Sequence, residues 1–257
     1  MKWYRVLIIT LWFVLGSRVE AQESQSSKSV FPRGISFAYK YGSYAVTDEY
    51  ISKEKYSGVL PGFSASWSRF HDKYGYRLRL EYGSSSEIKN HNVSTTIYQF
   101  VLDHGFLYPF KQTQIFKKDV YFYLGPATEL YFFYNNQNIA VSGFDYAQSF
   151  AMLFSAAIQL EGICPIHETL QIESSLGLSM LSLGFRMVDS EEEDVSPARL
   201  LTLFSGTNAG FGLGLRYIPT HKLSLKLAYK LQITRISSWD PLLAASDNFV
   251  LFMTYHF

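Results

Sequence analysis

The chain ends in the stretch Phe249-Val250-Leu251-Phe252-Met253-Thr254-Tyr255-His256-Phe257, in which every odd position carries a large apolar side chain. An alternation with a period of two places these side chains on one face of an extended strand. The stretch is nine residues long, and about nine to eleven tilted residues are enough for a strand to cross a bilayer. We therefore interpret it as a transmembrane β-strand.

The first residues have the pattern of a secretory signal peptide. Lys2 and Arg5 precede a largely apolar run from Val6 to Leu15, and Val19-Glu20-Ala21 resembles a cleavage site. The apolar run is shorter than the about 20 residues that a membrane-spanning helix needs, so we expect strands to cross the membrane. The domain prediction is a signal peptide at 1–21, a flexible polar tail at 22–33 and a single β-domain at 34–257.

Composition narrows the class of protein further. The chain is 47% hydrophobic, 17% aromatic and only 18% charged, which is apolar for a secreted soluble protein. Its formal net charge of +1 gives no reason to expect a nucleic-acid partner. The single cysteine, Cys164, has no second cysteine with which to form an internal disulfide.

Alternation and turn signals predict about ten strands, with eight or twelve as alternatives. The longer connections would lie outside at 42–58, 83–93, 134–143, 187–199 and 237–248. The remaining connections would be short turns, except for 104–119, where an unrecognised piece of strand would alter the count. The ten predicted strands lie at about 34–41, 60–70, 76–82, 94–103, 120–133, 144–161, 170–180, 210–217, 223–234 and 249–257.

The less apolar face of these strands indicates what lies inside. It consists mainly of Ser, Gly and Ala with single charges between them, whereas a sheet face in water usually carries many charges. Small side chains suit the crowded bore of a narrow barrel. We therefore predict an all-β fold, a single up-and-down antiparallel transmembrane β-barrel.

At this point the chain resembles the small outer-membrane β-barrel proteins, especially the porin-like barrel families common in Bacteroidota. The resemblance rests on the predicted architecture, on Tyr-rich strands such as Val120 to Tyr134 and on the terminal strand. It implies residence in the outer membrane of a Gram-negative bacterium, with the tail in the periplasm. It also implies that Tyr255 and the terminal Phe257 act as the insertion signal for the barrel-assembly machinery.

Charged residues on the inward face form the main candidate site. Their signs are balanced, and unpaired charges in a narrow bore would cost several kcal/mol each. We therefore expect a lumen closed by ion pairs. The predicted charge network comprises Arg77, Arg79, Glu81, Glu129, Glu173, Lys226 and Lys230, with Asp103, Glu161 and Arg216 also facing inward.

Catalytic and metal-binding candidates are few. An omptin-like protease would need His and Asp at the outer rim, where His91 with Asp48 or Asp240 is the only candidate set. An acidic run lacks the spacing and glycine of a calcium loop, so we interpret it as a solvated loop. Its potential metal ligands are Asp189, Glu191, Glu192, Glu193 and Asp194.

Three functions fit these observations. The leading hypothesis is a barrel with a structural or binding role, as an accessory of an envelope or secretion assembly, with no cofactor. The second is a rim hydrolase, either an omptin-like protease or a lipid-modifying enzyme, and the third is a narrow channel. The expected partners are outer-membrane lipid and lipopolysaccharide, the assembly machinery during insertion, and an envelope protein.

Deleting Phe257 tests the role assigned to the terminal strand. We expect the truncated protein to be exported normally but to insert poorly, because the assembly machinery would lose the last residue of its recognition strand. The measurement is the amount of protein in outer-membrane and periplasmic fractions. Normal accumulation of the truncated protein in the outer membrane would contradict the assignment.

Overall fold

The computed structural model describes residues 33–70, 73–90, 93–115, 118–141, 144–187, 198–238 and 241–257. The predicted signal peptide and nearly all of the predicted tail lie outside these ranges. No helix among the described residues is long and apolar enough to span a membrane. The strands are β1 Gly34–Asp48, β2 Ser52–Val59, β3 Gly62–Phe70, β4 Gly75–Lys89, β5 Ser94–Ile115, β6 Lys118–Val141, β7 Phe144–His167, β8 Leu170–Met187, β9 Ala198–Thr202, β10 Gly206–Thr220, β11 Leu223–Ile236 and β12 Leu242–His256.

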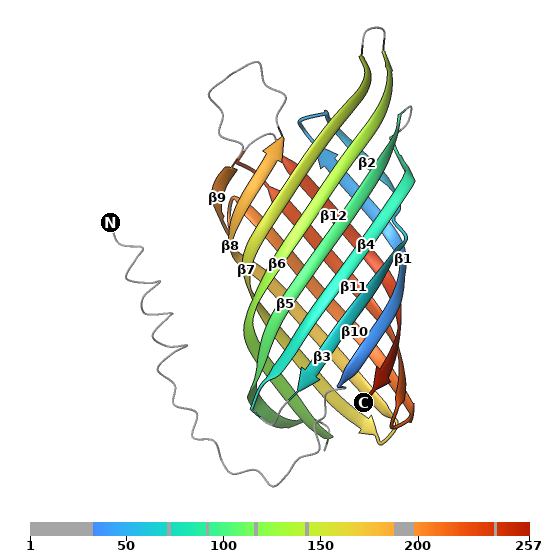
Figure 1. Cartoon of the computed structure of the whole chain (residues 1–257), viewed down its shortest axis with the longest axis vertical. Helices are drawn as coiled ribbons and strands as arrows, with labels where there is room; N and C mark the ends of the chain where they lie inside the picture. Colours follow the sequence, from blue (N-terminus) through green and yellow to red (C-terminus); the bar gives the residue numbers. More distant parts are fainter. Residues whose placement is uncertain are drawn as a thin grey trace, which may run out of the picture. The chain divides into compact units, whose positions relative to one another are not determined.

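The strands form one antiparallel sheet that closes on itself (Figure 1). The closing pair is β1 with β12, which are in register from Gly34 opposite His256 to Asp48 opposite Leu242. Apart from this closure, strands pair with the next strand in the sequence or, at β1–β3, β2–β4 and β8–β10, with the next but one, as in an up-and-down barrel. The predicted fold class is therefore confirmed.

At two positions in the ring, two consecutive strands share one place. β2 and β3 pair with the upper and lower parts of β1, and they are separated only by Leu60 and Pro61. In the same way β9 and β10 both pair with β8, with residues 203–205 between them. The twelve strands thus form ten passes along the barrel wall, which matches the predicted number of strands that cross the membrane.

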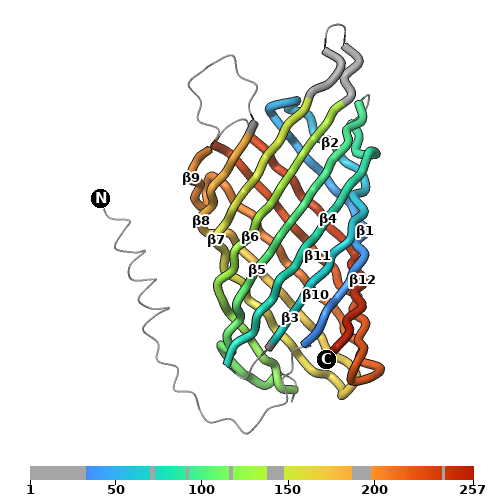
Figure 2. The backbone as a smooth tube through the Cα atoms, viewed as in Figure 1, coloured from blue at the N-terminus to red at the C-terminus, as the bar shows by residue number. Residues whose placement is uncertain are grey.

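We call the end of the barrel that holds Gly34 and Phe257 the terminal end, and the opposite end the hairpin end. The strands run obliquely between the two ends (Figure 2). They are longer than predicted, because β5 continues to Ile115 and β6 begins at Lys118, so most of 104–119 is strand. The predicted outer connections are also wrong in part, since much of 42–58, 83–93, 134–143 and 237–248 extends the strands.

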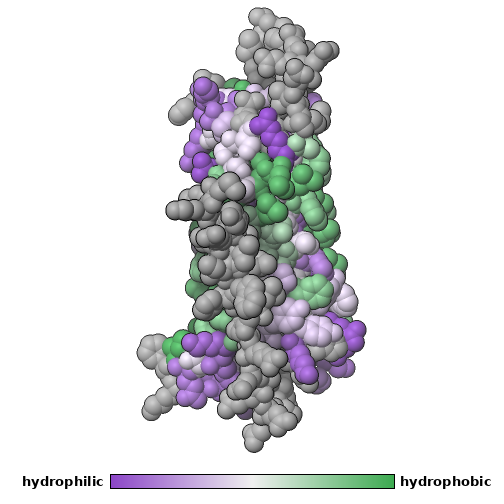
Figure 3. Space-filling model, turned by 90° about the vertical axis from the view of Figure 1, so that its left-hand side faces the viewer, coloured by the Kyte–Doolittle hydropathy of each residue, from purple (hydrophilic) through white to green (hydrophobic). Residues whose placement is uncertain are grey.

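In the terminal half of the barrel, apolar side chains point outward. On β1 the outward Phe37 and Tyr41 are 61% and 55% exposed, while Ala38 and Lys40 point inward and are buried. On the surface seen in Figure 3, apolar residues gather at mid-height and hydrophilic residues gather toward both ends. This arrangement is the one expected of a wall that faces lipid.

In the hairpin half the two faces of β1 exchange character. Tyr44 and Val46 continue the inward face of β1 but are apolar and 2% and 1% exposed, whereas the outward Ser43 is exposed. The inward side chains here pack into a core like that of a water-soluble barrel. The core consists of Tyr44, Val46, Tyr56, Leu60, Ile88, Ile97, Val101, Tyr131, Phe133, Ala151, Leu153, Leu201, Ile236, Leu242 and Ala244.

Truncating this core should destabilise the protein much more than truncating the outer face. Leu153→Ala removes a side chain that is fully buried, and we expect it to lower the free energy of unfolding by about 2–5 kcal/mol. Leu251→Ala is the matched control, because Leu251 is 55% exposed on the outer face. Urea unfolding in detergent micelles measures both, and equal losses for the two variants would contradict the packing described here.

Candidate functional site

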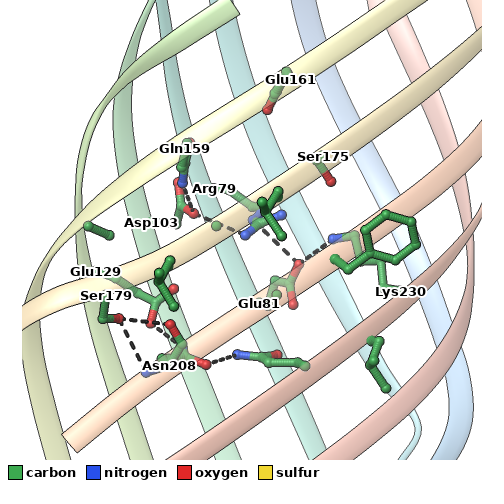
Figure 4. Close-up of a pocket in the computed structure, with 18 of the residues that line it drawn as sticks. Arg79, Glu81, Asp103, Glu129, Gln159, Glu161, Ser175, Ser179, Asn208 and Lys230 are labelled. Carbon is green, nitrogen blue, oxygen red and sulfur yellow. Dashed lines mark hydrogen bonds and ion pairs between the residues drawn. The ribbon is translucent and has the colours of Figure 1, made fainter. Parts of the chain in front are cut away.

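The centre of the lumen holds a cluster of paired charges, which we call the central charge cluster: Lys40, Arg79, Glu81, Asp103 and Lys230. Arg79 Nη2 donates a hydrogen bond to Asp103 Oδ2 at 3.0 Å, and Arg79 Nε lies 3.4 Å from Glu81 Oε1. Lys230 Nζ donates to Glu81 Oε1 at 2.8 Å, and Lys40 Nζ lies 3.9 Å from Glu81 Oε2. Figure 4 shows these contacts as a continuous chain from Asp103 to Lys230.

The strand alternation explains how these groups meet. Arg79 and Glu81 are two residues apart on β4, and both face inward because successive side chains of a strand point to opposite faces. Asp103 is on the neighbouring strand β5, but Lys230 is on β11 across the bore. The contact between Glu81 and Lys230 therefore ties together parts of the wall that are not neighbours in the sheet.

A second group, the terminal charge cluster, lies closer to the terminal end and contains Glu173, Arg216 and Lys226. The Glu173 carboxylate accepts hydrogen bonds from Arg216 Nη2 at 3.2 Å and from Lys226 Nζ at 2.9 Å. Arg216 also donates from Nη1 to the hydroxyls of Ser224 and Thr254, at 2.8 and 3.3 Å. One carboxylate thus serves two cations.

Arg77 lies near both clusters and makes its own contacts. It forms an ion pair with Glu161, and its Nη2 donates to Gln159 Oε1 at 2.8 Å. Gln159 in turn donates from Nε2 to Asp103 Oδ2 at 2.7 Å, which connects Arg77 to the central charge cluster. An amide side chain therefore joins the Arg77–Glu161 pair to the central charge cluster.

Glu129 stands apart from the other predicted network residues. Its carboxylate accepts a hydrogen bond from Asn208 Nδ2, and within the described part of the chain it has no ion pair. It is opposite Asp103 in the register of β5 and β6. Of the seven residues of the predicted network, the structure brings Arg79, Glu81 and Lys230 together, and Glu173 with Lys226, and it places Arg77 with Glu161.

A buried ion pair lies within the hairpin half, between Asp48 and Arg186, whose side chains are 1% and 0% exposed. Asp48 also accepts hydrogen bonds from Ser149 and from Asn135 Nδ2, the latter at 3.4 Å. A carboxylate held in this way is not available at an open rim. The other two residues of the rim set, His91 and Asp240, lie outside the described residues.

The described residues do not form a cluster of metal-binding side chains. No group of three or more His, Cys, Asp or Glu side chains in the described ranges is placed to hold an ion. The candidate ligands Asp189, Glu191, Glu192, Glu193 and Asp194 lie outside those ranges.

The bore is nearly filled. Two of its cavities, lined by described residues, have volumes of about 80 and 60 Å³, and each has room for only a few water molecules. The first, which we call the upper cavity, is lined by the central charge cluster. The second, which we call the lower cavity, is lined by residues of the terminal charge cluster with Arg77 and Glu161. The apolar core of the hairpin half lies beyond the central charge cluster.

The proposed insertion signal lies on the outer surface. Tyr255 and Phe257 are 54% and 58% exposed, and the backbone N–H of Phe257 donates to the carbonyl of Arg33 at 3.4 Å. Both aromatic side chains are therefore accessible at the terminal end.

Several members of the site were missed at the sequence level. Lys40 belongs to the polar face of the first predicted strand, so its alternation could have identified it. Gln159 and Asn208 are uncharged, and a search for charges passes over them. Arg186 lies after an irregularity in the register at Ala156/Ala157 of β7, and such an irregularity disrupts simple alternation.

Comparisons with known proteins agree with the fold. No family model and no curated protein sequence matches the chain. The outer membrane protease OmpT from Escherichia coli superposes with a TM-score of 0.51 at 9% identity, covering 91% of this chain and 100% of that one. The transport unit of the autotransporter AIDA-I from Escherichia coli has a TM-score of 0.43 at 9% identity, with 97% of each chain covered. Neisserial surface protein A has a TM-score of 0.40 at 12% identity, covering 88% of this chain and 99% of that one.

The two glutamates of the predicted network should respond differently to neutralisation. Glu173→Gln leaves Arg216 and Lys226 without their carboxylate, and we expect it to lower the free energy of unfolding by about 3–5 kcal/mol. Glu129→Gln is the matched control, because its side-chain oxygen can still accept the bond from Asn208, and we expect a loss below about 1.5 kcal/mol.

Denaturant unfolding in micelles measures both variants. A Glu173→Gln protein that unfolds at the same denaturant concentration as the parent would show that water screens the charges of the terminal cluster. A Glu129→Gln loss as large as that expected for Glu173→Gln would show that Glu129 has a cationic partner.

Proposed function

We propose that this protein is an integral outer-membrane β-barrel of a Gram-negative bacterium, with a closed lumen and a structural or binding role. The observation that carries the proposal is the filling of the bore. Paired charges occupy its terminal half and an apolar core occupies its hairpin half. A barrel filled in this way is a rigid wall element rather than a conduit.

The outer surface supports a membrane location. The apolar side chains that cover the terminal half could not be left in water over so large a surface without cost. Tyrosines lie at both edges of this region, as in the aromatic girdles of outer-membrane barrels. Tyr41 and Tyr82 lie toward the hairpin end, and Tyr217 and Tyr255 lie toward the terminal end, all at least 45% exposed.

The filled bore speaks against the channel hypothesis. An ion that passed along the axis would have to displace both the network around Glu81 and fully buried side chains such as Leu153 and Phe133. Removing water from an ion in such surroundings costs several kcal/mol.

The residues that the structure describes offer no specific support for the rim hydrolase. Asp48 is buried against Arg186, and the likeness to an outer-membrane protease extends to the fold alone. We therefore retain the non-enzymatic proposal. On this proposal, lipid and lipopolysaccharide surround the wall, the assembly machinery inserts it, and an envelope protein is its partner.

Fractionation followed by electrical recording tests the proposal. The full-length protein should be recovered with outer membranes and should migrate differently on gels with and without boiling, because a closed barrel resists detergent until heated. In planar bilayers it should give no steady conductance, with an open porin in the same bilayers as the control. Recovery as a soluble periplasmic protein would contradict the location, and a large stable conductance would contradict the closed lumen.

A further inference from the structure

The lower cavity is unusual for its charge. Six charged side chains line it, of which four are cationic and two are anionic. The walls between them are made of small residues, including Ser175 and Gly212. The charged side chains are Arg77, Arg79, Lys226, Lys230, Glu161 and Glu173.

The cations, rather than the carboxylates, have accessible surface in the lumen. The side chains of Arg77, Arg79, Lys226 and Lys230 are 20%, 24%, 19% and 20% exposed, whereas those of Glu161 and Glu173 are 8% and 13% exposed. Because these groups face inward, their accessible surface faces the lumen cavities. Each carboxylate is covered by its cationic partner, so the lower cavity presents positive charge.

Two ammonium groups are held close to one ring. Lys226 Nζ and Lys230 Nζ lie 4.5 and 5.2 Å from the centroid of Phe252. Each donates one hydrogen bond to a carboxylate, Glu173 or Glu81, while an ammonium has three N–H donors. Both therefore keep donors for a further acceptor.

The positive charge is not cancelled elsewhere in the described part of the lumen. Six cations face inward in the terminal half, against five carboxylates, and one of these carboxylates, Glu129, contacts no described cation. The excess is one positive charge over this part of the lumen and two over the lining of the lower cavity, so a bound anion would offset it. The cations are Lys40, Arg77, Arg79, Arg216, Lys226 and Lys230, and the carboxylates are Glu81, Asp103, Glu129, Glu161 and Glu173.

We propose that the lower cavity binds one small inorganic oxyanion of the phosphate or sulfate type. Guanidinium groups prefer oxyanions because their N–H donors match two oxygens at once, and Lys226 and Lys230 provide point charges. A cavity of about 60 Å³ has room for about four water-sized atoms, because each needs about 10–15 Å³ of cavity volume. A tetrahedral oxyanion presents four oxygens.

Calorimetric titration tests the proposal with the full mature protein in an uncharged detergent. Sodium phosphate, and separately sodium sulfate, is titrated at fixed pH, with sodium chloride holding the ionic strength constant. We expect saturable binding of one oxyanion per chain and a rise in Tm that saturates over the same concentrations. The absence of saturable binding, or equal responses to chloride and to the oxyanions, would overturn the proposal.

Paired variants locate the site. Lys226→Gln removes one cation of the lower cavity, and we expect it to weaken binding about tenfold or more, because a hydrogen bond to a charged group is lost. Lys40→Gln is the matched control, since it removes the same charge from the same lumen, but Lys40 lines only the upper cavity. Equal affinities in Lys226→Gln and the parent would overturn the assignment.

A third variant keeps the test decisive if Lys226→Gln does not fold. Ser175→Leu leaves every charge in place and fills the lower cavity, so it should abolish binding while the protein still migrates as a folded barrel on unboiled gels. Unchanged binding in a folded Ser175→Leu protein would show that the anion binds elsewhere.

Discussion

Closure of the sheet is the constraint on which the rest of the structure depends. The pairing of β1 with β12 runs from Gly34 opposite His256 to Asp48 opposite Leu242, so neither strand is left as an edge. A ring of ten passes encloses a bore that side chains can almost fill. Every inward group must therefore pack against, or pair with, groups on the opposite wall. The contact between Glu81 and Lys230 is one such pairing.

The bore satisfies this requirement in two ways along its length. Where the outer surface is apolar, the interior is polar, and charges such as Glu173 are matched by cations. On β1, where the outer surface becomes polar after Tyr41, the interior becomes a core around residues such as Tyr44 and Val46. Only the first arrangement needs lipid around it. On β1, the inward side chains change from charged to apolar between Lys40 and Tyr44. This change therefore indicates the height on the barrel at which the wall leaves the apolar layer of the membrane.

Alternation predicted the ten passes and the faces of most side chains. Arg77, Arg79 and Glu81 face the lumen as their spacing requires. The partners were harder to predict, because pairing across a bore depends on the stagger between strands, and a period of two contains no information on stagger. Glu129 therefore meets Asn208 rather than a cation. The strand extensions were missed because the apolar period fades once both faces become mixed.

The same stagger explains why the filling of the bore is uneven. The small residues of β8 and β10 lie beside the long side chains of the neighbouring strand β11 and across the bore from those of β4, and these side chains do not fill every gap. At Gly210 an added Cβ would have only the carbonyl oxygen of Leu231 nearby, at 3.8 Å, so space remains open there. At Gly212 an added Cβ would lie 2.5 Å from Ser175 Oγ, so the wall is already tight. Gly210 lines the upper cavity and Gly212 lines the lower one, so the lower cavity is the more tightly walled of the two. An anion bound in the lower cavity would therefore be held at close range by Lys226 and Lys230, whose ammonium groups have hydrogen-bond donors to spare.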